Sequence, residues 1–167
     1  NGLVLDRFGN KMSKRLGNAV NPFEAINEFG SDPLRWYMIA NSSPWDNLKY
    51  DPEGVRETSR KLFATLYNTY SFFALYANVD GFDNSAPQVP VAERPEIDRW
   101  ILSLLNTLIR EVEEALDDYE PTKAARAIND FVNDNLSNWY VRLNRKRFWG
   151  GEMDKDKLAA YQTLYTC

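Results

Sequence analysis

The 167-residue chain contains no histidine and a single cysteine, Cys167. Imidazole and thiolate groups are the usual ligands of structural zinc, so the sequence excludes a zinc site of that kind, and we expect no metal site in this chain. One cysteine gives no disulfide framework and is compatible with a reducing cytosol. No leader-like segment and no apolar run of about 20 residues is present, so we expect a cytoplasmic protein with no membrane partner.

Charge is nearly balanced, with 20 basic and 24 acidic residues and a formal net charge of −4. Such a chain is not attracted as a whole to nucleic acid, so we expect no DNA partner, and any RNA contact has to come from local basic patches. The sequence also lacks a glycine-rich phosphate loop and a run of alternating strands and helices. Its hydrophobic content of 44% is nevertheless ample for a buried core.

Basic residues gather near the start of the chain, around two Gly-Asn turn dipeptides at residues 9–10 and 17–18. Within residues 1–22 the only acid is Asp6, whereas the bases are Arg7, Lys11, Lys14 and Arg15. We expect a flexible, locally cationic loop here. Such a loop suits a polyanion such as a nucleotide triphosphate.

Residues 6–18 resemble the KMSKS loop of class I aminoacyl-tRNA synthetases, and the motif positions are filled by Lys11, Met12, Ser13, Lys14 and Arg15. Arg15 stands where the family has serine, a departure that keeps both lysines. The resemblance implies that these five residues bind ATP, which is accompanied by Mg in the parent enzyme. It also implies a catalytic role for Lys11 and Lys14, which would hold the ATP phosphates and the leaving pyrophosphate. The alternative is a solvated basic turn.

The same family carries a second ATP motif, an HIGH-like stretch that needs histidines, and this chain has none. We therefore expect a fragment that holds the end of a catalytic domain and the region C-terminal to it, acts with the remainder of the synthetase chain and is inactive alone. The alternative is a non-catalytic helical RNA-binding or scaffold module in which the loop is idle. Amino-acid-dependent pyrophosphate exchange separates the two.

Helix start and stop signals follow the loop. Asn21 can cap a short helix that ends before Gly30, and the run Asp-Pro-Leu-Arg at residues 32–35 starts another, which Pro44 ends. That run resembles the element after the KMSKS loop in the synthetase family, where it belongs to a linking domain. We therefore expect a linking helical segment over residues 21–50.

Apolar residues at spacings of three, four or seven predict the helices that follow, over residues 52–77, 95–119, 122–149 and 154–165. In the first of these, Leu66 and Tyr70 lie on the expected buried stripe, as do Trp139, Tyr140 and Leu143 in the third. Residues 78–95 carry three prolines and little periodicity, which indicates a linker.

The only candidate strand is residues 3–5, so the pattern predicts an all-α fold. We expect an antiparallel helical bundle over residues 51–167, preceded by the linking segment and by residues 1–20 as the end of a catalytic domain. In the synthetase family this bundle is the anticodon-binding domain. The resemblance therefore implies tRNA as a partner.

Three runs, at residues 66–73, 98–103 and 136–142, resemble the synthetase subgroup for branched aliphatic amino acids. Residues 138–149 are most similar to isoleucyl-tRNA synthetases, which implies isoleucine and tRNA(Ile) as substrates of the parent. A valyl-tRNA synthetase is the alternative, because that family shares the Asp-Arg-Trp-Ile-Leu run at residues 98–102. The amino-acid pocket lies outside this chain, so the specificity rests on the resemblance.

A second basic cluster consists of Arg142, Arg145, Lys146 and Arg147, with aromatic residues interleaved. Cations beside aromatic rings suit an RNA backbone and unstacked bases, so these four residues are the candidate nucleic-acid site. The alternative is that they pair with acids on neighbouring helices, such as Glu111, Glu113 or Asp117.

Overall fold

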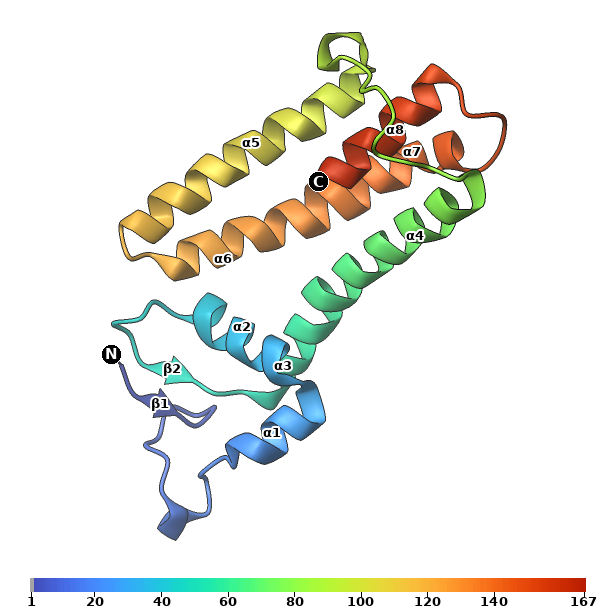
Figure 1. Ribbon diagram of the computed structural model, residues 1–167. Coiled ribbons are helices and arrows are strands. Elements are labelled where there is room, and N and C mark those ends of the chain that lie inside the picture. The colour runs from blue at the N-terminus through green and yellow to red at the C-terminus, as the bar shows by residue number, and fades with distance from the viewer. Residues whose placement is uncertain (1) are drawn as a thin grey trace. The chain divides into compact units, whose positions relative to one another are not determined.

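The computed structural model describes residues 2–167, and most of them are helical (Figure 1). The chain divides into two compact units, one made of residues up to 64 with 111–129 and the other of residues 65–110 with 130–167. Within residues 2–167 the only strands are two residues long each, so the predicted all-α class is confirmed. None of the described helices combines the length and apolar character needed to cross a membrane.

The first unit contains a small parallel sheet of β1 (Val4–Leu5) and β2 (Leu48–Lys49), labelled in Figure 1. Val4 lies opposite Leu48 and Leu5 opposite Lys49. The candidate strand near residues 3–5 is confirmed, but its partner was missed. Two residues are too few to show an alternating pattern, and parallel pairing joins segments that are far apart in the chain.

Two short helices within residues 21–50, the predicted linking segment, pack on one another. Helix α1 (Pro22–Phe29) begins as expected, because the Asn21 side chain accepts a hydrogen bond from the Phe23 N–H at 3.0 Å. Gly30, at φ 85°, follows its end. Helix α2 (Ser31–Asn41) begins one residue before Asp32, which was expected to start it and instead pairs with Arg35 at 3.1 Å.

One long helical stretch follows, made of α3 (Pro52–Thr58), a π turn η2 (Ser59–Phe63) and α4 (Ala64–Asp80). Asp51 caps it by accepting a hydrogen bond from the Glu53 N–H at 3.1 Å. The predicted helix is confirmed, but the π turn was not foreseen. A π turn holds more residues than an α turn, so it rotates every later side chain around the axis. Leu66 and Tyr70, expected on the buried stripe, are exposed.

The remaining helices are α5 (Glu96–Asp117), α6 (Pro121–Asp130), α7 (Arg142–Phe148) and α8 (Lys155–Thr166). A long π segment η4 (Phe131–Val141) joins α6 to α7. Asp98 near the start of α5 meets Arg147 near the end of α7, and Trp100, further along α5, meets Trp139, which precedes α7, so the two segments run antiparallel. Asp154 caps α8 by accepting from the Lys157 N–H at 2.7 Å. The expected helices and their antiparallel packing in the second unit are therefore present.

The π segment η4 changes which residues of the third predicted stripe are buried. Buried positions recur at a four-residue spacing, at Val132, Leu136, Tyr140, Asn144 and Phe148, and Phe131 and Val141 are buried as well. Trp139 and Leu143, expected in the core, are each 56% exposed, whereas Tyr140 is fully buried as expected. The expectation assumed an uninterrupted α-helix, and the wider π turns shift the phase. An aromatic ring and an aliphatic side chain are thereby placed on the surface.

The linker between α4 and α5 is docked on α8 through polar side chains. Val89 N–H donates to Gln162 Oε1 at 2.9 Å, and Gln162 Nε2 donates to the Pro87 carbonyl at 3.1 Å. Arg94, which is buried, donates to the Val89 carbonyl and to Thr163 Oγ1, both at 2.9 Å. These bonds satisfy the buried polar groups of a segment that has little secondary structure apart from the 3₁₀ turn η3 (Val91–Glu93).

Candidate functional site

The KMSKS-like loop has one residue anchored in a core, and its cations are exposed. Met12 packs against a small core made of Ala25, Tyr37, Tyr50 and Val55. Lys11, Lys14 and Arg15 are exposed. The loop therefore holds its backbone with one apolar side chain while its charged groups remain in solvent, where an anionic ligand could meet them.

Ser13 fixes the local geometry of the loop. Its backbone is extended at φ −151°, and its hydroxyl accepts a hydrogen bond from the Leu16 N–H, which caps the short 3₁₀ helix η1 (Lys14–Leu16). Gly17 follows at φ 67°, in the left-handed region that glycine adopts without a steric penalty. The second Gly-Asn dipeptide of the sequence is thus the turn that ends this helix.

The lysines of the loop have no acidic partner among residues 2–167, and neither does Arg15. The nearby acid, Asp6, instead accepts hydrogen bonds from backbone and amide groups of the loop. The hydrogen bond from Asn18 is the main reason why the pKa of Asp6 lies below its usual value. Asp6 is therefore charged at neutral pH, but its oxygens accept hydrogen bonds from these neutral groups. The cations of the loop remain available to a ligand.

The second basic cluster separates into three exposed cations and one that is partly buried. Arg142, Arg145 and Lys146 are exposed on α7 and form no ion pair within the described part of the chain. The side chain of Arg147 is only 15% exposed and pairs with two carboxylates. All four were expected to be surface cations available to nucleic acid, and the placement of Arg147 differs from that expectation.

Arg147 joins three helices of the second unit. Its guanidinium binds Asp98 on α5 bidentately, at 2.6 and 2.9 Å, and Asp156 on α8 at 2.8 and 2.9 Å. Asp98 is fully buried and also accepts the Tyr140 hydroxyl at 2.7 Å. Burial opposes the Arg147 charge, but the hydrogen bonds that Arg147 donates to the two carboxylates outweigh it and raise the pKa of Arg147. Burial, and then the Asp98 charge, raise the pKa of Tyr140.

Exposed aromatic and apolar side chains lie in sequence beside the three free cations. We call the set Arg142, Arg145, Lys146, Trp139, Leu143 and Trp149 the α7 surface. The Trp139 ring also contacts that of Trp100 on α5, with ring centroids 6.5 Å apart. Cations next to solvent-accessible indole rings combine phosphate attraction with a platform for base stacking.

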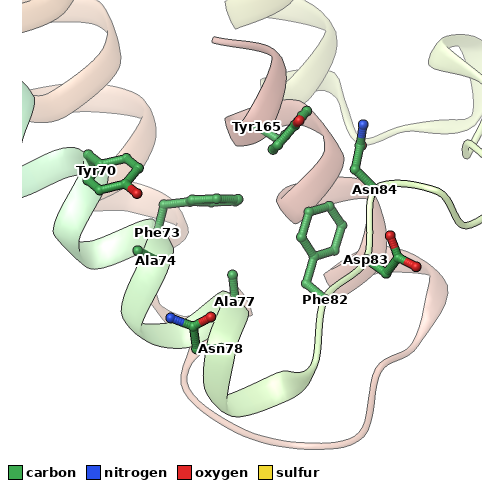
Figure 2. Close-up of a pocket in the computed structure, with 9 residues that line it drawn as sticks. All are labelled: Tyr70, Phe73, Ala74, Ala77, Asn78, Phe82, Asp83, Asn84 and Tyr165. Atoms are coloured by element: carbon green, nitrogen blue, oxygen red, sulfur yellow. The ribbon is translucent and has the colours of Figure 1, made fainter.

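A hollow of about 370 Å³ lies in the second unit (Figure 2). Its walls include the rings of Phe73 and Phe82, which meet edge to face with centroids 6.0 Å apart. Its one carboxylate, Asp83, accepts from the backbone and hydroxyl of Ser85, which lowers the pKa of Asp83. No cation lines the hollow. We therefore attribute it to aromatic packing rather than to a reactive site.

No group of three or more acidic or cysteine side chains among residues 2–167 could hold a metal ion. Magnesium that accompanies a nucleotide usually needs only one or two carboxylates besides the phosphates, so this finding concerns sites with three or more protein ligands.

Two family profiles match the chain. "tRNA synthetases class I (I, L, M and V)" matches residues 1–51, and "Anticodon-binding domain of tRNA ligase" matches residues 98–167. The chain is 75% identical over all 167 residues to an Isoleucine–tRNA ligase of Bacteroides thetaiotaomicron. It belongs to the class I tRNA synthetases.

Other relatives agree with this placement. The chain is 74% identical over 166 residues to an Isoleucine–tRNA ligase of Porphyromonas gingivalis and 52% identical over 164 residues to one of Thermus thermophilus. These three matches include 98–100% of this chain but only 14–16% of each relative's length. The chain thus corresponds to a small part of the proteins that it resembles.

A solved structure supports the fold. A LeuRS of Agrobacterium radiobacter K84, crystallised in a ternary complex with tRNA and LeuAMS, matches 98% of this chain and 18% of its own, with a TM-score of 0.70. Its sequence identity is 20%, so the similarity concerns the fold. The helical architecture is therefore one that a class I synthetase uses.

Proposed function

We propose that this chain is the part of an isoleucine–tRNA ligase that supplies the ATP-phosphate-binding loop and a section of the tRNA-binding surface. The observation that carries the proposal is the 75% identity over the whole chain to a protein named Isoleucine–tRNA ligase. A Cytophaga hutchinsonii relative with the same name is 65% identical over 167 residues. The relatives named here all carry the isoleucine name, which favours isoleucine over the valyl alternative.

Lys11 and Lys14 are proposed to stabilise the pyrophosphate that leaves ATP when isoleucine is activated. Both are exposed and free of acidic partners, and Met12 anchors the backbone between them. Negative charge grows on the leaving group in the transition state, so cations placed there lower the barrier more than they tighten substrate binding. Arg15 adds a third cation beside them and keeps the loop electropositive.

The test replaces Lys14 by alanine in the full-length synthetase and measures isoleucine-dependent ATP–pyrophosphate exchange. Loss of one preorganised donor costs about 2.7–4 kcal/mol of transition-state stabilisation, so kcat should fall about 10²- to 10³-fold with little change in the KM for isoleucine. Lys11→Ala should act in the same direction. Lys123→Ala, which removes an exposed lysine of α6, is the matched control and should leave the exchange unchanged.

A Lys14→Ala enzyme that keeps its kcat and changes only the KM for isoleucine would refute the phosphate role. The same assay on residues 1–167 alone should show no exchange, because the chain has no histidine with which to build an HIGH-like motif. Exchange by the isolated chain would contradict the proposal that it acts only with the remainder of the synthetase.

The α7 surface is proposed to contact tRNA, with tRNA(Ile) as the partner implied by the relatives. Arg142, Arg145 and Lys146 are free to bind phosphates, which contribute affinity and salt dependence without reading sequence. Trp139 and Trp149 have exposed rings on which an unstacked base could lie. Arg147 is left out of this role because Asp98 and Asp156 already occupy its guanidinium.

The test is the double variant Arg145→Ala/Lys146→Ala in the full-length synthetase, with tRNA binding measured at several salt concentrations. Loss of two phosphate contacts should weaken binding and lower the slope of log K against log [salt] by about 2, while pyrophosphate exchange stays intact. Arg110→Ala/Lys123→Ala removes two exposed cations outside the α7 surface and is the control. Equal salt slopes for the two double variants would remove the α7 surface from the tRNA interface.

A further inference from the structure

The loop that carries Lys11 and Lys14 is held together by two side chains outside the five motif positions, Asp6 and Asn18. Asp6 accepts from the Phe8 N–H at 3.0 Å and from the Asn10 N–H at 2.8 Å, which closes the turn before the loop. Its second oxygen accepts from Asn18 Nδ2 at 3.0 Å, across 12 residues. The beginning and the end of the loop are thereby joined.

Asn18 reaches the loop backbone on both sides of Met12. Its Oδ1 accepts from the Ser13 N–H at 2.8 Å, and its Nδ2 donates to the Lys11 carbonyl at 3.2 Å as well as to Asp6. The lysine side chains themselves take no part in these bonds. The backbone next to each lysine is held by these hydrogen bonds, whereas the ammonium groups remain free.

The chemistry of this arrangement requires an amide at position 18. An asparagine accepts through its oxygen and donates through its nitrogen at the same time, which matches a backbone N–H on one side and two oxygen acceptors on the other. Aspartate cannot donate, so it would place a second carboxylate against Asp6 and leave the Lys11 carbonyl without this donor.

We propose that Asp6 and Asn18 are positioning residues for the reaction, which together hold the Lys11–Met12–Ser13 backbone so that the lysine ammonium groups meet the ATP phosphates without further ordering. This inference rests on the proposed phosphate role of the two lysines. Groups that are already in place when charge develops contribute more to the rate than groups that have to be ordered first. The hydrogen bonds of the Asp6 and Asn18 side chains supply that order.

The experiment compares Asn18→Ala, Asn18→Asp, Lys14→Ala and Asn18→Ala/Lys14→Ala in the full-length synthetase by ATP–pyrophosphate exchange. Displacement of a catalytic group by about 1 Å can cost about 10²-fold in rate, so each Asn18 variant should lose about 10- to 100-fold in kcat at an unchanged KM for isoleucine. In the Lys14→Ala background, Asn18→Ala should cost much less, because part of what it positions is gone.

Asn47→Ala is the matched control, because the Asn47 side chain also accepts from a backbone amide, Leu3 N–H at 2.8 Å, but does not touch the lysine loop. A second experiment measures the rate of limited trypsin cleavage after Lys11, Lys14 and Arg15. Asn18→Ala should accelerate this cleavage and Asn47→Ala should not. Both variants should retain tRNA affinity, whereas a variant that fails to fold would lose it.

The outcomes separate the two proposals. If Lys14→Ala is inactive but Asn18→Ala is fully active, the positioning role is wrong and the phosphate role stands. If Lys14→Ala keeps full activity, the phosphate role fails, and trypsin cleavage alone then decides whether Asn18 orders the loop. If Asn18→Ala costs as much with Lys14 absent as with Lys14 present, Asn18 does not act through Lys14, which overturns the inference.

Discussion

Replacement of Arg147 by methionine should destabilise the second unit strongly. The substitution leaves the fully buried Asp98 carboxylate with the Tyr140 hydroxyl as its remaining side-chain donor among the described residues. Removal of one partner of a buried pair costs about 3–5 kcal/mol, because the other charge stays buried and uncompensated. That is a large part of the roughly 5–15 kcal/mol that stabilises a typical domain.

Thermal unfolding of the 167-residue chain, followed by circular dichroism, measures this effect. At about 2–4 °C per kcal/mol for a chain of this size, the loss predicts a drop in Tm of about 6–20 °C. Arg145→Met is the matched control, because it makes the same chemical change two positions away on α7, at an exposed residue without an ion pair. Its stability should stay within about 0.5 kcal/mol of the parent.

A double variant distinguishes a true charge pair from packing. If Arg147 and Asp98 interact directly, Arg147→Met and Asp98→Ala together should cost less than the sum of the two single changes. The reasoning is refuted if Arg147→Met and Arg145→Met lower Tm by similar amounts. Strict additivity of the two single losses would likewise show that Arg147 does not stabilise the unit through Asp98.

Two further predictions concern other parts of the chain. Gly54→Ala should destabilise α3 by about 1–3 kcal/mol in urea unfolding, although alanine favours helices, because its Cβ would lie 2.5 Å from a ring carbon of Tyr37. Tyr37 cannot retreat, since its hydroxyl is bonded to the Lys49 carbonyl at 2.8 Å, and a neutral or stabilising result would contradict this. Hydrogen bonds from Lys157 and Tyr161 hold the pKa of Asp80 below its ordinary value of 3.8. The contribution of Asp80 to stability is therefore present above pH 3.8 and is lost as the pH falls through the folded-state pKa. The difference in urea midpoint between the parent and Asp80→Asn should be constant from pH 7 to about pH 5 and shrink below pH 3.8, and a difference that grows on acidification would show the sign to be wrong.

Local chemistry explains why the helix starts were predictable. Asn21, Asp51 and Asp154 each accept a backbone N–H two or three residues ahead, an interaction confined to one turn. The glycine stop of α1 is equally local, because it depends on a positive φ at one residue, Gly30. The exposed lysines of the loop belong to the same category, since their identity and spacing are written in consecutive residues.

The π segments show where a sequence pattern is insufficient. An apolar residue every three or four positions predicts a helix, and the helix is there, but the pattern does not reveal turns of a different width. Tyr140 and Trp139 were assigned to the same face, yet one is fully buried and the other is 56% exposed. The exposure of the Trp139 ring therefore became visible only in the structure.

The sequence by itself determined that this chain is helical, where most of its helices begin and end, and which loop carries the lysines. Only the tertiary structure decided which side chains are free to act. Arg145 and Arg147 have the same chemistry, but two positions correspond to about 200° around an α-helix, so one faces solvent and the other faces Asp98, 49 residues away. Asn18 was likewise read as part of a turn, and its bond to Asp6 depends on how 12 residues of chain fold back. Such pairings depend on which surfaces meet in space, and contacts between residues far apart in the sequence leave no local pattern from which they could be read.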